Sequence, residues 1–111
     1  MRLVLAVVAV AALAVGSLAA QDKASQGRKI YDNKDCAKCH QIAGKGNKIG
    51  KLDGVASKMD AEEIRKWLTN PLEMEKSLTK KPKVKMSSKI KTMNLGAADI
   101  EALVAYMQTL K

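Results

Sequence analysis

Residues 36–40 read Cys36-Ala37-Lys38-Cys39-His40, and this stretch decides what the chain folds around. It holds both cysteines and the single histidine of the 111-residue sequence. Two thiols stand three residues apart, and an imidazole directly follows the second. In a local turn both sulfurs can reach the two vinyl groups of one haem, while the imidazole projects towards the iron. The motif predicts one haem c per chain, bonded to Cys36 and Cys39 and ligated by His40.

Three other uses of this motif are open. A structural disulfide would close so short a loop that it constrains little of the unfolded chain, and it gives His40 no role. A dithiol oxidoreductase also uses Cys-x-x-Cys, but in a strand-to-helix setting that the flanking sequence does not indicate. A zinc site needs four ligands, and the chain has no second cysteine pair and no second histidine. Only the haem hypothesis uses all three side chains.

The first twenty residues have the features of an export signal. A positive charge at position 2 precedes an unbroken run of Leu, Val and Ala, and small residues up to Ala19 or Ala20 offer a cleavage site. We therefore expect a signal peptide over 1–20, a domain over 21–111 and a periplasmic protein. An uncleaved membrane anchor is the alternative, because residues 3–20 carry no charge and a span needs roughly twenty residues.

Helical spacing of apolar residues predicts an all-α fold with substantial loop. A first helix is expected over Asp22–Asn33 and a second from Asp60 to the residue before Asn70. Asp60 can cap the second helix, and proline at position 71 disfavours helical geometry just before it. The last helix should open at Gly96, with apolar residues recurring at i, i+3, i+4 and i+7. The glycine-rich stretch 36–55 and the basic stretch from 71 to about 94 are predicted loops.

Composition supports a fold built around a large apolar group. The chain has no Phe, two Tyr and one Trp, so its side chains offer little aromatic mass for a core. A buried haem would give them an apolar surface to pack on.

The chain carries a formal net charge of +9, and seven lysines between positions 76 and 91 are not interrupted by any acid. No aromatic interleaving or nucleic-acid motif accompanies them, so nucleic acid is not an expected partner. Two interpretations are open: a solvated face that maintains solubility, or a docking face for an acidic redox protein. The lysines expected at such a face are Lys80, Lys81, Lys83, Lys85 and Lys89.

The chain from residue 21 onward resembles a small class I cytochrome c. Besides the motif at 36–40, the resemblance includes Gly27 and Tyr31 in the first helix and Leu103, Ala105 and Tyr106 in the last. It implies three to four helices and loops wrapped around one haem, and a close crossing of the first and last helices at a small glycine.

Trp67-Leu68-Thr69-Asn70-Pro71 resembles the segment that lines the haem pocket in this family. The resemblance implies that Trp67 forms a wall of the haem site, with an ordinary core position as the alternative. The stretch Gly50-Lys51-Leu52 stands where the family has Gly-Pro-x-Leu, and Leu52 is an expected haem contact. We expect the backbone carbonyl of Lys51 to accept a hydrogen bond from the second imidazole nitrogen of the ligand histidine.

The resemblance implies a distal methionine as the sixth iron ligand, a pairing with histidine that raises the haem potential. Pro82-Lys83-Val84-Lys85-Met86 matches the family's distal loop in its proline, second lysine and methionine. Met86 is therefore the expected ligand. Met93 is the alternative, because the stretch between Met86 and the last helix is longer than usual. Met107 lies on the apolar stripe of the last helix and is expected in the core.

With a histidine and a methionine both bound, iron has no vacant position, which favours electron transfer over catalysis. We expect a monomeric single-electron carrier that is not an enzyme, and membrane association only if the signal is retained. The alternatives are a haem sensor or weak peroxidase with an open distal site, and a cytochrome subunit of a larger oxidoreductase.

Overall fold

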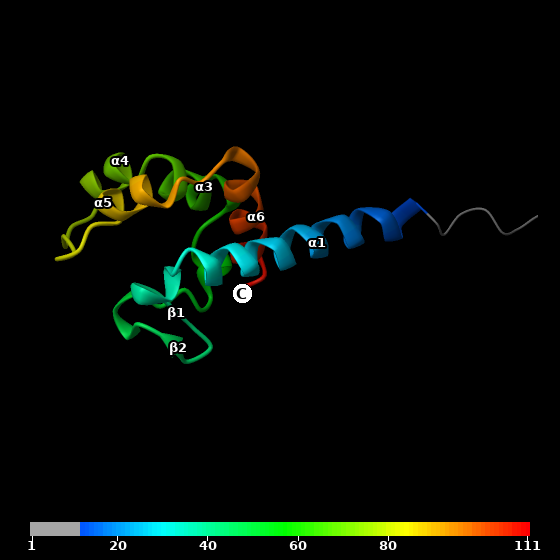
Figure 1. Ribbon diagram of the computed structural model, residues 1–111, viewed down its shortest axis with the longest axis horizontal. Helices are drawn as coiled ribbons and strands as arrows, with labels where there is room; N and C mark the ends of the chain where they lie inside the picture. The colour runs from blue at the N-terminus through cyan, green and yellow to red at the C-terminus, as the bar shows by residue number, and fades with distance from the viewer. Residues whose placement is uncertain (1–11) are drawn as a thin grey trace, which may run out of the picture.

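A computed structural model describes the backbone of residues 12–111 and the side chains of residues 19–111 (Figure 1). This part of the chain contains six α-helices, three short 3-10 helices and one two-stranded antiparallel sheet, which lies at one edge of the molecule. The α-helices are α1 (Ala12–Asn33), α2 (Val55–Lys58), α3 (Ala61–Thr69), α4 (Pro71–Lys76), α5 (Met86–Ile90) and α6 (Ala97–Gln108). The remaining elements are η1 (Cys36–Lys38), β1 (Gln41–Ile42), β2 (Lys45–Gly46), η2 (Lys48–Gly50) and η3 (Lys91–Met93).

The first and last helices, α1 and α6, cross at Gly27. A Cβ atom at this glycine would collide with the backbone carbonyl of Ala102 and would lie 2.7 Å from the Cβ of Tyr106. One turn further on, the ring of Tyr31 meets that of Tyr106 edge to face, with centroids 5.9 Å apart. The close helix crossing that the resemblance implied is confirmed, and it fixes the end of α1 that leads into the motif.

Helix α3 begins and ends where the sequence predicts. The Asp60 carboxylate accepts a hydrogen bond from the backbone N–H of Glu63 at 2.9 Å, and the helix ends at Thr69, directly before the Asn70-Pro71 pair. Helix α6 begins after Gly96, whose backbone N–H donates to Asp99 at 3.0 Å. The cap of α3 is the predicted Asp60, and α6 begins directly after Gly96, its predicted start.

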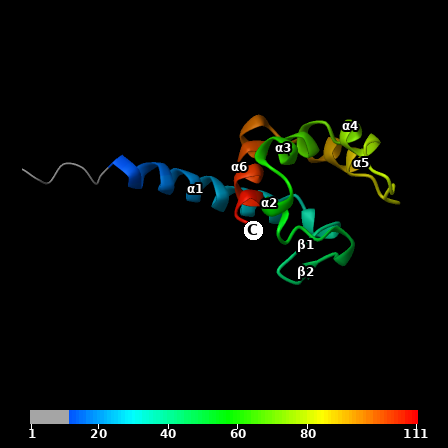
Figure 2. The same cartoon turned by 180° about the vertical axis from the view of Figure 1, so that it is seen from behind.

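Helix α3 is tied to α6 by an ion pair. Arg65 donates to the two carboxylate oxygens of Glu101 at 2.7 and 3.0 Å, and it also pairs with Glu62 within α3. Figure 2 shows α2 beside the end of α6, where the Ala56 N–H donates to the Leu110 carbonyl at 2.9 Å. Helix α6 therefore contacts α1, α2 and α3 and is the centre of the fold.

The first helix is longer than predicted, because α1 starts at Ala12 and not at Asp22. The apolar, alanine-rich residues before position 22 have good helix propensity, so the helix extends back to Ala12. The proposed signal peptide falls partly on residues 1–11, which lie outside the described residues, and partly on the start of α1. None of the helices described in residues 12–111 is both long and apolar enough to cross a membrane.

The stretches predicted as loops contain short elements that the sequence analysis missed. The basic stretch after Asn70 forms α4 and α5, and the glycine-rich stretch contains the hairpin of β1 and β2, paired through Gln41–Gly46 and Ile42–Lys45. Elements of two to six residues are too short to show a hydrophobic period, so periodicity cannot find them. The all-α class is confirmed, with more helices than the expected three to four.

The apolar core includes one face of α6. Leu103 and Val104 of this helix expose only 3 % of their surface, and Met107 on the next turn exposes 7 %. The expectation that Met107 belongs to the core is confirmed. Several core side chains also line a large cavity, so the core and the candidate site share a wall.

Candidate functional site

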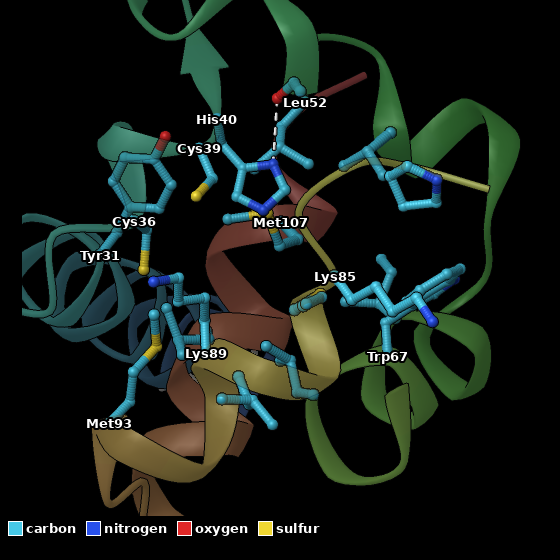
Figure 3. A pocket seen from close by; sticks show the side chains of 18 of the residues that line it. Tyr31, Cys36, Cys39, His40, Leu52, Trp67, Lys85, Lys89, Met93 and Met107 are labelled. Atoms are coloured by element: carbon cyan, nitrogen blue, oxygen red, sulfur yellow. Dashed lines mark hydrogen bonds between the residues drawn. The ribbon is translucent and has the colours of Figure 1, made fainter. Parts of the chain in front are cut away.

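A cavity of about 350 Å³ lies between the motif, helices α3 and α6, and the segment around α5. Its walls are mostly apolar side chains (Figure 3). Every candidate site residue from the sequence lines it: Cys36, Cys39, His40, Leu52, Trp67, Met86 and Met93. The fold thus brings together on one surface residues that are up to 57 positions apart, from 36 to 93.

The two cysteines stand on one tight turn. The backbone N–H groups of Cys39 and His40 both donate to the Cys36 carbonyl, at 3.1 and 3.0 Å, and Asp35 enters the turn in a left-handed conformation. Both thiols are free, and burial raises the pKa of Cys36 to about 11. A reactive dithiol has a thiol pKa lowered into or below the neutral range, so this environment does not fit the oxidoreductase alternative.

His40 is held by its Nδ1 atom, which donates to the Gly50 carbonyl oxygen at 3.0 Å (Figure 3). A carbonyl can only accept, so Nδ1 carries the proton and Nε2 keeps its lone pair. Burial lowers the pKa of His40, which keeps the imidazole neutral. The prediction of Lys51 as the acceptor is wrong by one residue: counted back from Leu52, the proline position of Gly-Pro-x-Leu falls on Gly50.

The residues after His40 fold back and brace the motif. Asn47 donates through its backbone N–H to the carbonyls of Ala37 and His40, at 3.1 and 2.9 Å, and through its side chain to the Lys38 carbonyl at 3.0 Å. Gly46 makes this return possible, because it has a φ of +108° and leaves no room for a Cβ beside the His40 carbonyl. The hairpin β1–β2 therefore positions the motif.

Trp67 and Leu52 both line the cavity and are partly buried, Trp67 on α3 and Leu52 after η2. Each contributes to the wall of the cavity. Met86 and Met93 also line the cavity with partly buried side chains, Met86 as the first residue of α5 and Met93 as the last of η3. The fold brings both candidate methionines to the cavity.

Lysines lie at the edge of the same cavity. All five lysines of the expected docking face are exposed, and Lys85 and Lys89 also line the cavity, where Figure 3 shows both side chains. Two exposed apolar side chains, Ile49 at 91 % and Val84 at 61 %, contribute to the lining as well. The mouth is therefore apolar with a positive border.

One buried acid of the site was not predicted from the sequence. Glu75 on α4 lines the cavity, exposes only 4 % of its surface and accepts two hydrogen bonds from Ser87 on α5. The bond from the Ser87 backbone lowers the pKa of Glu75, which keeps the carboxylate ionised at neutral pH. The sequence did contain a signal for its position. Proline at 71 favours the start of a helix there, and Glu75, one turn later, then lies on the same face as Pro71, which is buried.

The site fits a haem of the c type. Two thiols on one turn, an imidazole whose Nε2 is left for a metal, and apolar walls all belong to one cavity. Four methionines line the cavity, Met59, Met86, Met93 and Met107, and they include both candidates for the distal ligand, Met86 and Met93. This is the donor set of a covalently bound haem with histidine and methionine ligands.

Comparison with known proteins gives the family. Residues 24–111 match the family model described as cytochrome c, and the chain belongs to this family. Members bind haem c covalently and serve as electron carriers. Searches of curated proteins and of solved structures gave no match.

Proposed function

We propose that this protein is a periplasmic carrier of single electrons with one haem c per chain. Cys36 and Cys39 form the thioether bonds, His40 is the proximal ligand and Met86 the distal ligand. The observation that carries the proposal is that both thiols and the Nε2 side of His40 line one apolar cavity, which a thioether also reaches. When bound, the haem supplies an iron that alternates between ferrous and ferric states.

The protein's own contribution is to hold the ligands still. The Gly50 carbonyl fixes the tautomer and orientation of His40, and such a hydrogen bond also increases the basicity of the ligand nitrogen. The apolar walls, including Trp67 and Leu52, keep water away from the centre and favour the less charged ferrous form. Fixed ligands in a dry pocket let one electron pass with little rearrangement.

Met86 is preferred to Met93 because of its place in the chain. It follows the proline and lysine pattern of the family's distal loop, and it begins α5, so its backbone is fixed by a helix. Met93 ends η3 next to Asn94, which has a left-handed conformation, and the side chain of its neighbour Thr92 donates back to the Lys89 carbonyl of α5. Met93 would then pack against the cavity wall.

The lysine face is proposed to dock an acidic redox protein. Lys80, Lys83, Lys85 and Lys89 are exposed, and the structure gives these four no salt bridge within residues 19–111, whereas Lys76 pairs locally with Glu73. Unpaired positive charge around a cavity mouth attracts an acidic surface to that edge, at a rate that falls with ionic strength. Export to the periplasm is proposed from the signal features of residues 1–20.

Carbon monoxide binding tests the closed site. The freshly purified ferrous haem protein should not bind carbon monoxide readily at neutral pH, because both axial positions are taken. Rapid formation of a carbon monoxide complex would contradict electron transfer through a closed site and would support a sensor or peroxidase instead.

A further inference from the structure

The first turn of α5 lacks a cap of its own. Its N-cap residue is Lys85, whose side chain has donors but no acceptor, and no side chain of α5 caps the helix. A helix of five residues is too short to be stable without outside support. The segment before it, residues 77–85, is largely exposed and contains four lysines that repel one another.

Glu75 supplies the missing acceptor from the neighbouring helix. Its Oε1 accepts from the Ser87 backbone N–H at 2.8 Å, and its Oε2 accepts from the Ser87 hydroxyl at 2.7 Å. Lys81 draws the intervening segment back by donating to the Glu75 carbonyl at 2.7 Å. Figures 1 and 2 both show α4 and α5 side by side, in agreement with their contacts.

Burying the Glu75 carboxylate costs free energy, so its hydrogen bonds to Ser87 must compensate for that cost. Glu75 is 4 % exposed, and an ionised side chain in that environment is tolerated only where its oxygens are hydrogen bonded. Both of its oxygens are used on Ser87, which directly follows Met86 in the chain. A bidentate hold on one residue fixes the backbone of its neighbour far better than a single bond would.

We propose that Glu75 is a positioning residue for Met86: by capping α5 through Ser87, it holds the Met86 thioether at the cavity. The inference rests on the proposed function, because it needs Met86 to be the distal ligand. Within residues 19–111 the Glu75 carboxylate forms no hydrogen bond to Cys36, Cys39 or His40, so its effect passes through Ser87. This role gives a reason for the burial of Glu75 beside the lysine-rich segment 77–85.

Three variants of the haem protein test this role. Glu75→Ala removes both acceptors, Ser87→Ala removes only the hydroxyl, and Glu75→Gln keeps the shape, since its oxygen can accept from the backbone N–H and its amide can donate to the hydroxyl. Glu73→Ala is the matched control, because it removes an exposed acid from the same helix. Each is examined for the methionine-to-ferric-iron absorption band and for the rate at which imidazole displaces the distal ligand.

The expected result is graded. Glu75→Ala should weaken the band and speed imidazole binding by about tenfold or more, the usual effect of removing a residue that orients a metal ligand. Ser87→Ala should have a smaller effect, Glu75→Gln should restore most of the wild-type behaviour, and Glu73→Ala should match wild type. Circular dichroism of each variant ensures that a folded protein is compared.

Other outcomes separate this inference from the proposed function. If the methionine-to-ferric-iron band of Glu75→Ala is the same as that of wild type, the positioning role is overturned. It is also overturned if Glu75→Ala speeds imidazole binding by the same factor when Met86 has already been replaced by alanine. Loss of the band in Met93→Ala but not in Met86→Ala also overturns it, yet leaves the electron carrier intact. A wild-type protein without any such band refutes the closed site itself, and the positioning role with it.

Discussion

The Nδ1 atom of His40 lies 3.0 Å from the carbonyl oxygen of Gly50, and this contact joins the haem motif to the segment that returns beneath it. The bond can form only because residue 50 has no side chain: a Cβ there would collide with the Cys39 carbonyl and lie 2.9 Å from His40 Nδ1. One backbone position therefore sets both the tautomer and the orientation of the predicted proximal ligand.

Replacing Gly50 by alanine should destabilise the haem protein. The new methyl group meets backbone and the imidazole, neither of which can move freely, so we expect a loss of about 1–3 kcal/mol in unfolding free energy. Thermal melting of the haem protein measures it. Gly96→Ala is the control, because the nearest atom to its Cβ is 3.7 Å away, and only a small capping loss is expected. Equal stability of both variants would count against this geometry.

The Arg65–Glu101 pair should make stability depend on pH. Hydrogen bonds from Arg65 are the main cause that lowers the pKa of Glu101, so the folded state favours the ionised form more than the unfolded chain does. Its stabilisation is therefore complete above the ordinary glutamate pKa of about 4.3 and is lost as pH falls through the lowered folded value.

The melting temperature of wild type should exceed that of Glu101→Gln at neutral pH, and the difference should shrink as pH falls below about 4. Salt should reduce it as well, because the pair is partly exposed. Glu73→Gln, which breaks a local pair within α4, should show little difference at any pH. If the difference in melting temperature between wild type and Glu101→Gln increased at acidic pH, the stabilising role of the Arg65–Glu101 pair would be contradicted.

Spectra of two methionine variants identify the distal ligand. Met86→Ala should abolish the methionine-to-ferric-iron band and open the iron to carbon monoxide, because the variant lacks the sixth ligand. Met93→Ala should retain the band and bind little carbon monoxide, since its thioether only packs in the wall. The reverse pattern would exchange their roles.

Charge reversal at the cavity mouth should slow electron transfer to an anionic acceptor. Lys83→Glu and Lys89→Glu should each lower the rate of reduction of ferricyanide several-fold at low salt, because they weaken electrostatic attraction to that edge. Stopped-flow rates over a range of ionic strength provide the measurement. Lys58→Glu makes the same charge change at an exposed lysine of α2 that does not itself line the cavity, and it should have a smaller effect. Equal slowing by all three would show that only net charge matters.

The motif and the long helices could be predicted from sequence because their signals are local. Cys36, Cys39 and His40 form one short pattern. The start of α3 is indicated by its cap, Asp60, and its end by the proline at 71. The α1–α6 crossing was accessible through the resemblance at Gly27. These features depend on spacing, caps and breakers, which are visible without a structure.

The rest depends on contacts between distant residues. The helix start at Pro71 indicates which face Glu75 shares, but not what its carboxylate binds, because its partner Ser87 stands twelve positions later. The acceptor for His40 was misplaced by one residue because every position has a carbonyl, and aligning the motif on Gly50 instead of on Leu52 shifts the register by one. The short hairpin β1–β2 likewise forms through tertiary bracing by Asn47 and shows no period of its own.

Mass spectrometry of the denatured chain tests the central claim most directly. After expression with haem-maturation machinery and acid extraction, the wild-type chain should keep the mass of one haem, and Cys36→Ala with Cys39→Ala should keep none, because two thioether bonds hold the group. A chain that released all its porphyrin on extraction, or that carried none from a competent host, would contradict the account.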